Sequence, residues 1–194
     1  MDRMQEYYRN AILQNLCDEY KGKWRSISKN KTALFNMAMQ QQALPHLIFF
    51  ANSGIGLTKE YLETEFSNYI NGKYTAIDAD GVKGNYKTNL YIGEKPLLRL
   101  YDDVACFMWA NIPSVEIKPT KAVKIYVGCK SNITLNLKGY NSITLMLFDE
   151  SQVNINECDD TNTITTYKYS DDAHCNIDKY TLAKVKTFNK NLKL

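Results

Sequence analysis

Paired carboxylates are the feature of this sequence that could carry acid–base chemistry. Two carboxyl groups on either side of a glycosidic bond are what most glycoside hydrolases use. Asp is also common in turns, where paired acids are ordinarily solvated. We therefore favour a turn and solubility role, and a glycan-active enzyme stays the third hypothesis for function. The three pairs, all in the C-terminal half, are Asp149-Glu150, Asp159-Asp160 and Asp171-Asp172.

Histidine and cysteine do not form a pattern that indicates a metal centre or a nucleophile. Of the two His, His46 lies at an expected helix start, where a surface role is favoured. His174 precedes Cys175 and follows Asp171 and Asp172, but the spaced partners of a tetrahedral zinc site are missing. Neighbouring residues on a strand point to opposite faces, so this His and Cys do not suit a nucleophile and base. The five Cys are scattered without CxxC spacing, which predicts free thiols, no metal and no cofactor.

Lysines interleaved with tyrosines form the candidate binding surface. Cationic side chains can contact phosphates and Tyr rings can stack on bases, so this surface is the basis for predicting a nucleic-acid or nucleotide partner. Ordinary solvated lysines are the alternative that we favour. Gly54 and Gly56 are too close together for a dinucleotide motif and predict a helix end instead. The candidate binding residues are Lys124, Tyr126, Lys130, Lys138 and Tyr140, with Lys118 and Lys121 nearby in the sequence.

Composition and charge bound the class of protein. The chain has 194 residues, 44% hydrophobic residues and a formal net charge of +3, which is typical of a folded globular protein. No window reaches the roughly 18 apolar residues of a membrane helix, and the first residues lack a signal-peptide core, so we expect a cytoplasmic protein and no membrane partner. Eight carboxylates lie between Asp149 and Asp178, and five Lys without an acid lie between Lys179 and Leu194. We expect this basic tail to fold back near the acidic stretch.

Apolar residues at three- and four-residue spacing predict a small helical subdomain at the N-terminus. The first helix is expected to end near Gly22, and Thr32 fits the N-cap of the second. Pro45 fits the first turn of the third helix, which Gly54 ends, and Thr58 fits the N-cap of the fourth. The expected helices span residues 3–19, 31–43, 45–52 and 59–66.

The periodicity changes after residue 67. Asn71-Gly72 lies between two β-favouring flanks, which predicts a hairpin because both turn residues need a positive φ. The dense apolar content of residues 97–110 must lie in the core, with Phe107 and Trp109 as its expected anchors.

Four segments with alternating apolar residues then start ten residues apart and in the same phase. Val123, Ile133, Ile143 and Val153 begin them, and the next apolar residue follows two positions later in each. Alternate residues of a strand share a face, so the apolar residues of all four segments point to one side. Short links with Gly, Asn or Asp join the segments, and a weaker fifth segment starts at Ile164.

This ten-residue period fits two architectures. In a β-solenoid each unit is one side of a coil, and the units stack in parallel with like residues in ladders. In an antiparallel meander or sandwich, the links are four-residue hairpin loops. We favour the solenoid because the Asn- and Thr-rich outer positions keep the same phase. The predicted fold is therefore α+β, with a helical subdomain over residues 1–67 and a β-repeat subdomain with a basic tail over residues 68–194.

Part of the helical half resembles a group of uncharacterised proteins. The run from Gly56 to Tyr74 (GLTKEYLETEFSNYINGKY), with the residues from Cys17 to Trp24 and the second helix before it, is similar to small proteins of phages and prophages of gut Bacteroidales. The C-terminal repeat follows that group's pattern only loosely. No activity, catalytic residue or ligand is assigned in the group, so the resemblance implies a viral origin and carries no site.

Two functional hypotheses rank above the enzyme. The first is a non-enzymatic binding or structural module, such as a virion accessory or assembly protein, that associates with itself or with a virion or host protein. The second is a phage inhibitor of host defence that binds a host protein or sequesters a nucleotide. Both place the protein in the host-cell cytoplasm, and the first also places it in the virion.

Overall fold

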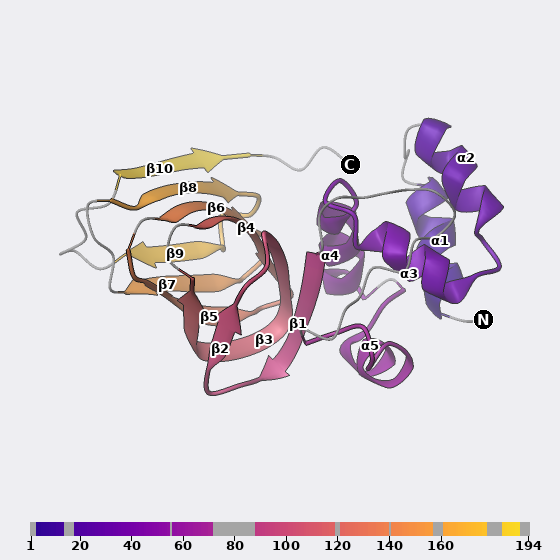
Figure 1. Cartoon of the computed structure of the whole chain (residues 1–194). Coiled ribbons are helices and arrows are strands. Elements are labelled where there is room, and N and C mark those ends of the chain that lie inside the picture. The colour runs from indigo at the N-terminus through magenta and orange to yellow at the C-terminus, as the bar shows by residue number, and fades with distance from the viewer. Residues whose placement is uncertain are drawn as a thin grey trace.

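The computed structural model describes residues 3–13, 18–54, 56–71, 88–118, 121–139, 141–156, 161–177 and 184–190. The helices are α1 (Arg3–Leu13), α2 (Asp18–Ser26), α3 (Lys31–Ala38), α4 (Leu44–Asn52) and α5 (Lys59–Glu65). The strands are β1 (Thr88–Glu94), β2 (Leu98–Leu100), β3 (Val104–Ile117), β4 (Lys121–Gly128), β5 (Asn132–Leu137), β6 (Asn141–Leu147), β7 (Gln152–Asn156), β8 (Thr163–Lys168), β9 (His174–Ile177) and β10 (Lys184–Asn189). The chain is therefore α+β, with its helices before its strands (Figure 1).

The strands form a parallel β-solenoid, which confirms the favoured architecture and excludes the meander. Every pairing between these strands is parallel. Sheet 1 contains β1, residues 104–110 of β3, β4, β6, β8 and β10; sheet 2 contains β2, residues 111–117 of β3, β5, β7 and β9. Consecutive ten-residue units thus alternate between the two sheets, and a strand stacks on the strand two units earlier.

Apolar ladders between the two sheets form the core of the solenoid. In sheet 1, Val123 pairs with Ile143 and Ile143 with Ile164; in sheet 2, Ile133 pairs with Val153. All five side chains are at most 3% exposed and belong to one packed cluster. The fifth segment at Ile164 is confirmed as β8. Stacking like on like lets each methyl group fill the gap beside the one below, at the density of protein interiors.

Left-handed backbone conformations turn the chain from sheet 1 to sheet 2. They occur at Gly93 (φ 84°), Trp109 (φ 50°), Cys129 (φ 54°), Lys130 (φ 57°) and Asp149 (φ 47°). Left-handed residues other than Gly are uncommon and carry strain, so their repetition at one corner shows that the stacked ladders impose the bend. This explains why Trp109 is only half-buried and is not the expected anchor of the solenoid core, whereas Phe107 is fully buried there.

The helical half has its own aromatic core. Tyr7 contacts Trp24 and Phe50 with ring centroids 5.5 and 5.6 Å apart, and Phe35 stacks on Phe66 at 4.2 Å. Each of these five rings is at most 1% exposed. Such pairs add to the free energy gained by burying the rings themselves.

Several helix boundaries differ from those predicted. Two helices replace the single one expected up to Gly22, and Gly22 lies inside α2, where a Cβ would meet nothing within 4 Å. Asn30, not Thr32, is the N-cap of α3, because its side chain accepts the Ala33 N–H at 3.0 Å. Thr58 caps α5 as predicted, since its hydroxyl oxygen accepts the Tyr61 N–H at 3.3 Å.

Other predicted helix signals are confirmed, and one strand signal falls outside the described residues. Pro45 lies in the first turn of α4, and Gly54 follows that helix with a φ of 69°. Asn71 has the expected positive φ of 61°, but the rest of the predicted hairpin lies outside the described part of the chain. None of the five described helices is long and apolar enough to cross a membrane.

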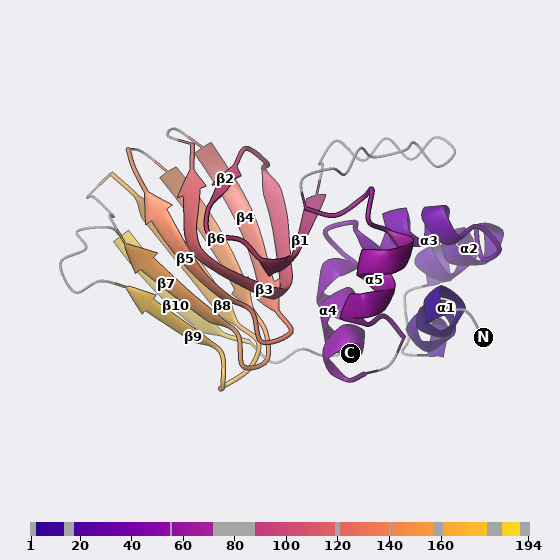
Figure 2. The same ribbon diagram turned by 90° about the horizontal axis from the view of Figure 1, so that it is seen from below.

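The helices pack beside the N-terminal coils of the solenoid, as Figure 2 shows. The outer face of sheet 1 joins the helical core there through buried side chains of β1, β3 and β4, among them Ile92, Cys106 and Tyr126. The contact is closest at Gly128, where an added Cβ would lie 2.2 Å from Cγ2 of Ile48 in α4. Glycine is therefore favoured at this position, because any side chain would force Ile48 to move.

We expect Leu145→Ala to lower the free energy of unfolding by about 2–5 kcal/mol, because it removes a fully buried member of a sheet 1 ladder. Thr144→Ala is the matched control, since Thr144 lies on the same strand and faces outward, where the effect should stay within about 0.5 kcal/mol. Urea unfolding of both variants measures the difference. An equal loss of unfolding free energy in both variants would contradict the assignment of Leu145 to the inner face of β6 and Thr144 to its outer face.

We expect Gly128→Ala to lower the free energy of unfolding by about 1–3 kcal/mol through overpacking against Ile48. Adding Ile48→Ala removes the colliding methyl group, so the double variant should lose less than the sum of the two single variants. Urea unfolding of the four proteins in this cycle gives the coupling energy. Strict additivity would contradict the close approach of α4 to β4.

Candidate functional site

Three successive rungs of the solenoid place an aromatic ring and two lysines at one corner of sheet 2. Leu100, Ile117 and Leu137 are inward residues in register at the ends of β2, β3 and β5. The residue after each of them turns outward, which gives the column Tyr101, Lys118 and Lys138. Strands in a sheet are about 4.8 Å apart, so the backbone positions in this column repeat at that spacing.

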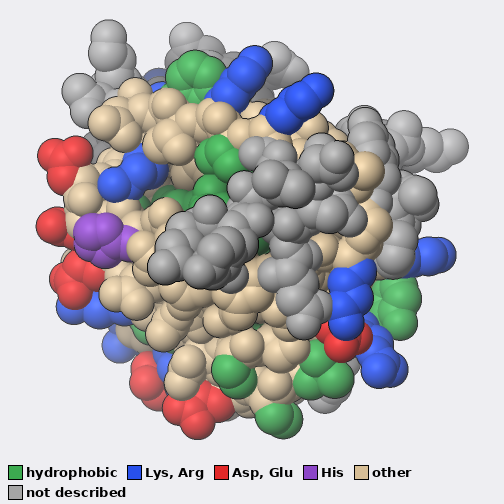
Figure 3. Space-filling view, turned by 90° about the vertical axis from the view of Figure 1, so that its left-hand side faces the viewer, with side chains coloured by type: hydrophobic (Ala, Val, Ile, Leu, Met, Phe, Trp, Pro, Cys, Tyr) green, Lys and Arg blue, Asp and Glu red, His purple; other side chains and the backbone are tan. Residues whose placement is uncertain are grey.

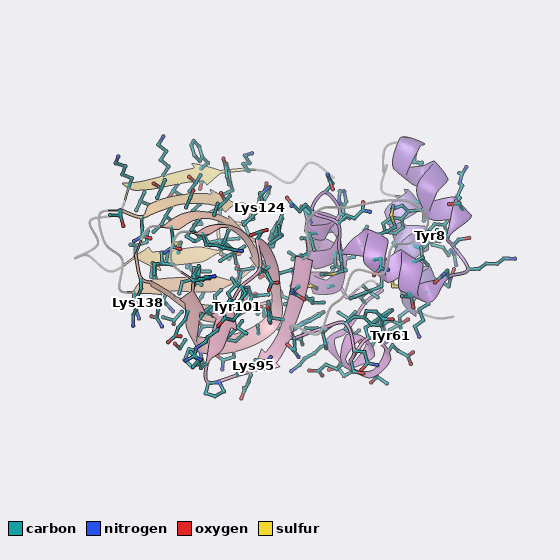
Figure 4. The ribbon with its side chains drawn as sticks, viewed as in Figure 1. Tyr8, Tyr61, Lys95, Tyr101, Lys124 and Lys138 are labelled. Carbon is teal, nitrogen blue, oxygen red and sulfur yellow. The ribbon has the colours of Figure 1, made fainter. Side chains whose placement is uncertain are left out.

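These residues line a recess of about 280 Å³ on the outer side of the corner. Tyr101 is 64% exposed, which is unusual for an aromatic ring and leaves its face available for contact. Figure 4 shows Tyr101 and Lys138 on the solenoid, away from the labelled tyrosines of the helical half. The recess is lined by Arg99, Leu100, Tyr101, Glu116, Ile117, Lys118, Asn136 and Lys138.

The recess is positively charged. Its lining contains three cationic side chains and one carboxylate, that of Glu116. Glu116 Oε2 lies 3.1 Å from Arg99 Nε, and both side chains are well exposed, so this ion pair contributes little to stability. The formal charges of the lining residues sum to +2. The cationic side chains of the recess can contact an anionic group, and the ring of Tyr101 can contact a flat or apolar group beside it.

Lys124 and Tyr126, from the predicted binding surface, lie against the helical half. Lys124 Nζ donates to Gln41 Oε1 at 3.0 Å, and the Tyr126 hydroxyl donates to the Gln41 carbonyl oxygen at 3.4 Å. Tyr126 is 3% exposed, and burial raises the pKa of its hydroxyl. Its ring is thus part of the contact between helices and sheet and does not face solvent, although the sequence pattern suggested stacking on a base.

The other predicted binding residues lie at different corners. Lys130 is exposed at the turn between β4 and β5, and its Nζ lies 3.1 Å from Glu150 Oε1. Lys138 lines the recess at the other end of β5, and Tyr140 lies outside the described residues. Among the described residues of the predicted set, only Lys138 lines the recess, where it joins Lys118. Sequence reasoning missed Arg99 and Tyr101, because the three-residue strand β2 carries no repeat that would place it in the stack.

A second, shallower groove of about 620 Å³ runs where Gln41 meets β4 and β6. Its charged groups already have partners: Lys121 Nζ lies 2.7 Å from Asp103 Oδ1, and Lys124 contacts Gln41. The Lys124 contact joins the helical half to the solenoid, and the Lys121–Asp103 pair joins β4 to the start of β3 within the solenoid. We therefore assign this groove a structural role and take the recess as the candidate site.

The three acidic pairs have different environments in the structure. Asp149 accepts hydrogen bonds from the backbone N–H groups of Cys129 and Lys130, the latter at 3.1 Å, so its carboxylate satisfies the turn of the preceding coil. Asp171 and Asp172 are exposed in the turn between β8 and β9, and Asp159-Asp160 lies outside the described residues. Asp149 thus has the turn role that the sequence favoured.

His174 and Cys175 point to opposite faces of β9, as predicted. His174 is exposed, whereas Cys175 lies half-buried on the inner side, where burial raises the pKa of its thiol. A raised pKa keeps the sulfur in the less nucleophilic thiol form. Within the described ranges, no three His, Cys, Asp or Glu side chains come together as a metal site would require.

The chain matches no protein-family model, no curated protein and no solved structure.

Asp149 gives a pH prediction. Burial raises the pKa of its carboxyl above the unfolded value, although the hydrogen bonds from Lys130 and Cys129 act against the shift. The folded state therefore binds this proton more readily than the unfolded state does. As the pH falls from about 7 to 4, the free energy of unfolding of the wild type should rise relative to that of Asp149→Asn.

Urea unfolding across this pH range measures the difference between the two proteins. Glu63→Gln is the matched control, because Glu63 is an exposed carboxylate in α5 and is not among the groups that shift the pKa of Asp149. A constant difference between the wild type and Asp149→Asn at all pH values would contradict the raised pKa.

Proposed function

We propose that this protein is a non-enzymatic binding module that uses the recess to hold an acidic segment of a protein partner. The observation that carries the proposal is the convergence of Arg99, Lys118 and Lys138 beside the exposed ring of Tyr101. Carboxylates on an extended segment can contact cations on successive rungs, while an apolar side chain of that segment packs on the ring.

The rigidity of the site supports this proposal. The recess residues lie on or directly after β2, β3 and β5, whose backbones are fixed by parallel hydrogen bonding. A site on paired strands holds its groups in place before a ligand arrives, so less conformational entropy is lost on binding. Asn136 adds to this order, since its Nδ2 donates to Ser114 Oγ at 2.8 Å.

The small dimensions of the recess favour a short acidic segment over a long nucleic acid. A single-stranded nucleic acid is ordinarily bound along a groove with several stacking rings. Here one exposed ring, three cationic side chains and one carboxylate line about 280 Å³. A formal net charge of +3 likewise gives the chain only a modest long-range attraction for polyanions.

Nucleotide sequestration is the second candidate function, and Tyr101 is the observation that favours it. A nucleobase can stack on this ring while Lys118 and Lys138 contact its phosphates. This function would make the protein an inhibitor of host defence that removes a nucleotide signal.

The setting of this activity is also a proposal. The resemblance of residues 56–74 to phage and prophage proteins supports a phage-encoded accessory or assembly protein. Such a protein would act in the host-cell cytoplasm or in the virion. In that setting the helical half docks on the assembly, while the solenoid presents the recess.

We expect Lys118→Glu with Lys138→Glu to abolish binding of a fluorescein-labelled Glu-rich peptide that also contains Leu. Fluorescence anisotropy at low and high salt measures the affinity, which should fall with salt because the contacts are ionic. The matched control is Lys29→Glu with Lys59→Glu, which makes the same charge change in the helical half and should bind like the wild type.

Comparison of the peptide with a nucleotide separates the two candidate functions, since both use the ring of Tyr101. If the peptide is the ligand class, the wild type binds it more tightly than a labelled nucleoside triphosphate. Tighter binding of the nucleotide, lost in Tyr101→Ala, would replace the first function with the second. Equal loss in the control variant would show attraction by overall charge and overturn both.

A further inference from the structure

We infer that the C-terminal end of the solenoid is a self-association surface, on which β10 of one copy pairs antiparallel with β9 of a second copy. The inference goes beyond the proposed function and uses different residues from the recess.

Both sheets end on an edge strand at this end of the stack. β10 pairs with β8 and β9 pairs with β7, and no further described strand lies beyond either. Figure 2 shows both strands at the end of the solenoid away from the helices. Edge strands present a row of backbone N–H and C=O groups that can pair with another chain.

The apolar ladders of the core are exposed at the same end. Val185 continues the ladder of Val123, Ile143 and Ile164, which are at most 3% exposed, yet Val185 is 41% exposed. In sheet 2, Ile177 continues the ladder of Ile155 and is half-buried, whereas Ile155 is fully buried. A further layer of backbone and side chains would cover Val185 and Ile177.

The two edges carry opposite charges. Residues 184–190 of the β10 edge contain Lys184, Lys186 and Lys190, all exposed, and no acid. Residues 169–177, which lead into and form β9, contain exposed Asp171 and Asp172 and no Lys or Arg. Charged side chains of both signs are also visible on the side of the solenoid drawn in Figure 3. The charges of the β10 edge of one copy are therefore complementary to those at the β9 edge of a second copy.

The path of the chain makes this meeting geometrically simple. The coil runs along sheet 1 and returns along sheet 2, so β10 and β9 run in opposite directions. A rotation of 180° about an axis parallel to the strands places β10 of one copy against β9 of the other, antiparallel, and repeats the contact in reverse. This is the isologous arrangement of a two-fold dimer.

The other two-fold arrangement is disfavoured by charge. Rotation about the normal to the sheets would place β10 against β10 of the second copy, with Lys facing Lys, which is destabilising. The same lysines therefore prevent one pairing and permit the other. Because the end of one coil offers little area, and the inward Thr187 and Asn189 at this end are polar, we expect a weak dimer that depends on concentration.

Charge exchange tests the inference. Sedimentation velocity of the wild type at increasing concentration should show a monomer–dimer equilibrium that weakens with salt. Lys190→Glu alone, or Asp172→Lys alone, places like charges at both contacts and should shift the equilibrium to monomer. The two substitutions in one chain restore opposite charges at both contacts and should restore the dimer.

A mixture of the two single variants provides an independent readout. In a heterodimer of Lys190→Glu with Asp172→Lys, each contact again joins opposite charges, so the mixture should dimerise although neither variant does so alone. Lys29→Glu serves as the control for a charge change far from the end.

Three results would overturn the inference. A wild type that stays monomeric at every concentration is one. A dimer that Asp172→Lys leaves intact is another, because it would use a different surface. Failure of the double variant and of the mixture to recover dimer would also reject the β9–β10 pairing. None of these results depends on peptide or nucleotide binding, so the proposed function can fail or stand separately.

Discussion

Parallel stacking in register is the constraint on which the structure depends. From β4 onward, each strand pairs with the strand 20 to 22 residues earlier, as Ile143 does with Val123, Ile164 with Ile143, and Cys175 with Val153. The stacking sends the same side chain of every unit into the core and forces the corner into left-handed conformations such as that of Asp149. The same register aligns the outward-facing side chains into columns that could bind a partner.

Much of the solenoid could be predicted because its signal is repeated. One strand with alternating apolar residues fits many folds, but several in the same phase specify like-on-like packing. The helical half offered no repetition. Gly22 was predicted to end a helix because glycine is a poor helix former. It is instead an exposed residue within α2, where its low helix propensity costs only about 1 kcal/mol. Trp109 was predicted to lie in the core because its side chain is large and apolar. Its position at the bend of β3 leaves it only half-buried.

The candidate site was harder to predict, because it is made by register between segments of unlike sequence. Lys124 and Tyr126 looked like an exposed pair, but exposure depends on what covers a strand, and α4 and the chain before it cover this part of β4. Tyr101 and Lys138 are far apart in sequence and come together only because Leu100 and Leu137 each align with Ile117. No spacing rule within one segment could show that.

The alternation of units between the two sheets has a consequence for how such a chain can change in length. A gain or loss of one ten-residue unit would move every later strand to the opposite sheet, and would exchange which outward column lies on which side. A gain or loss of two units would leave all later strands where they are. Viable length variants should therefore differ by whole coils, which keeps the number of units odd or even as it is here.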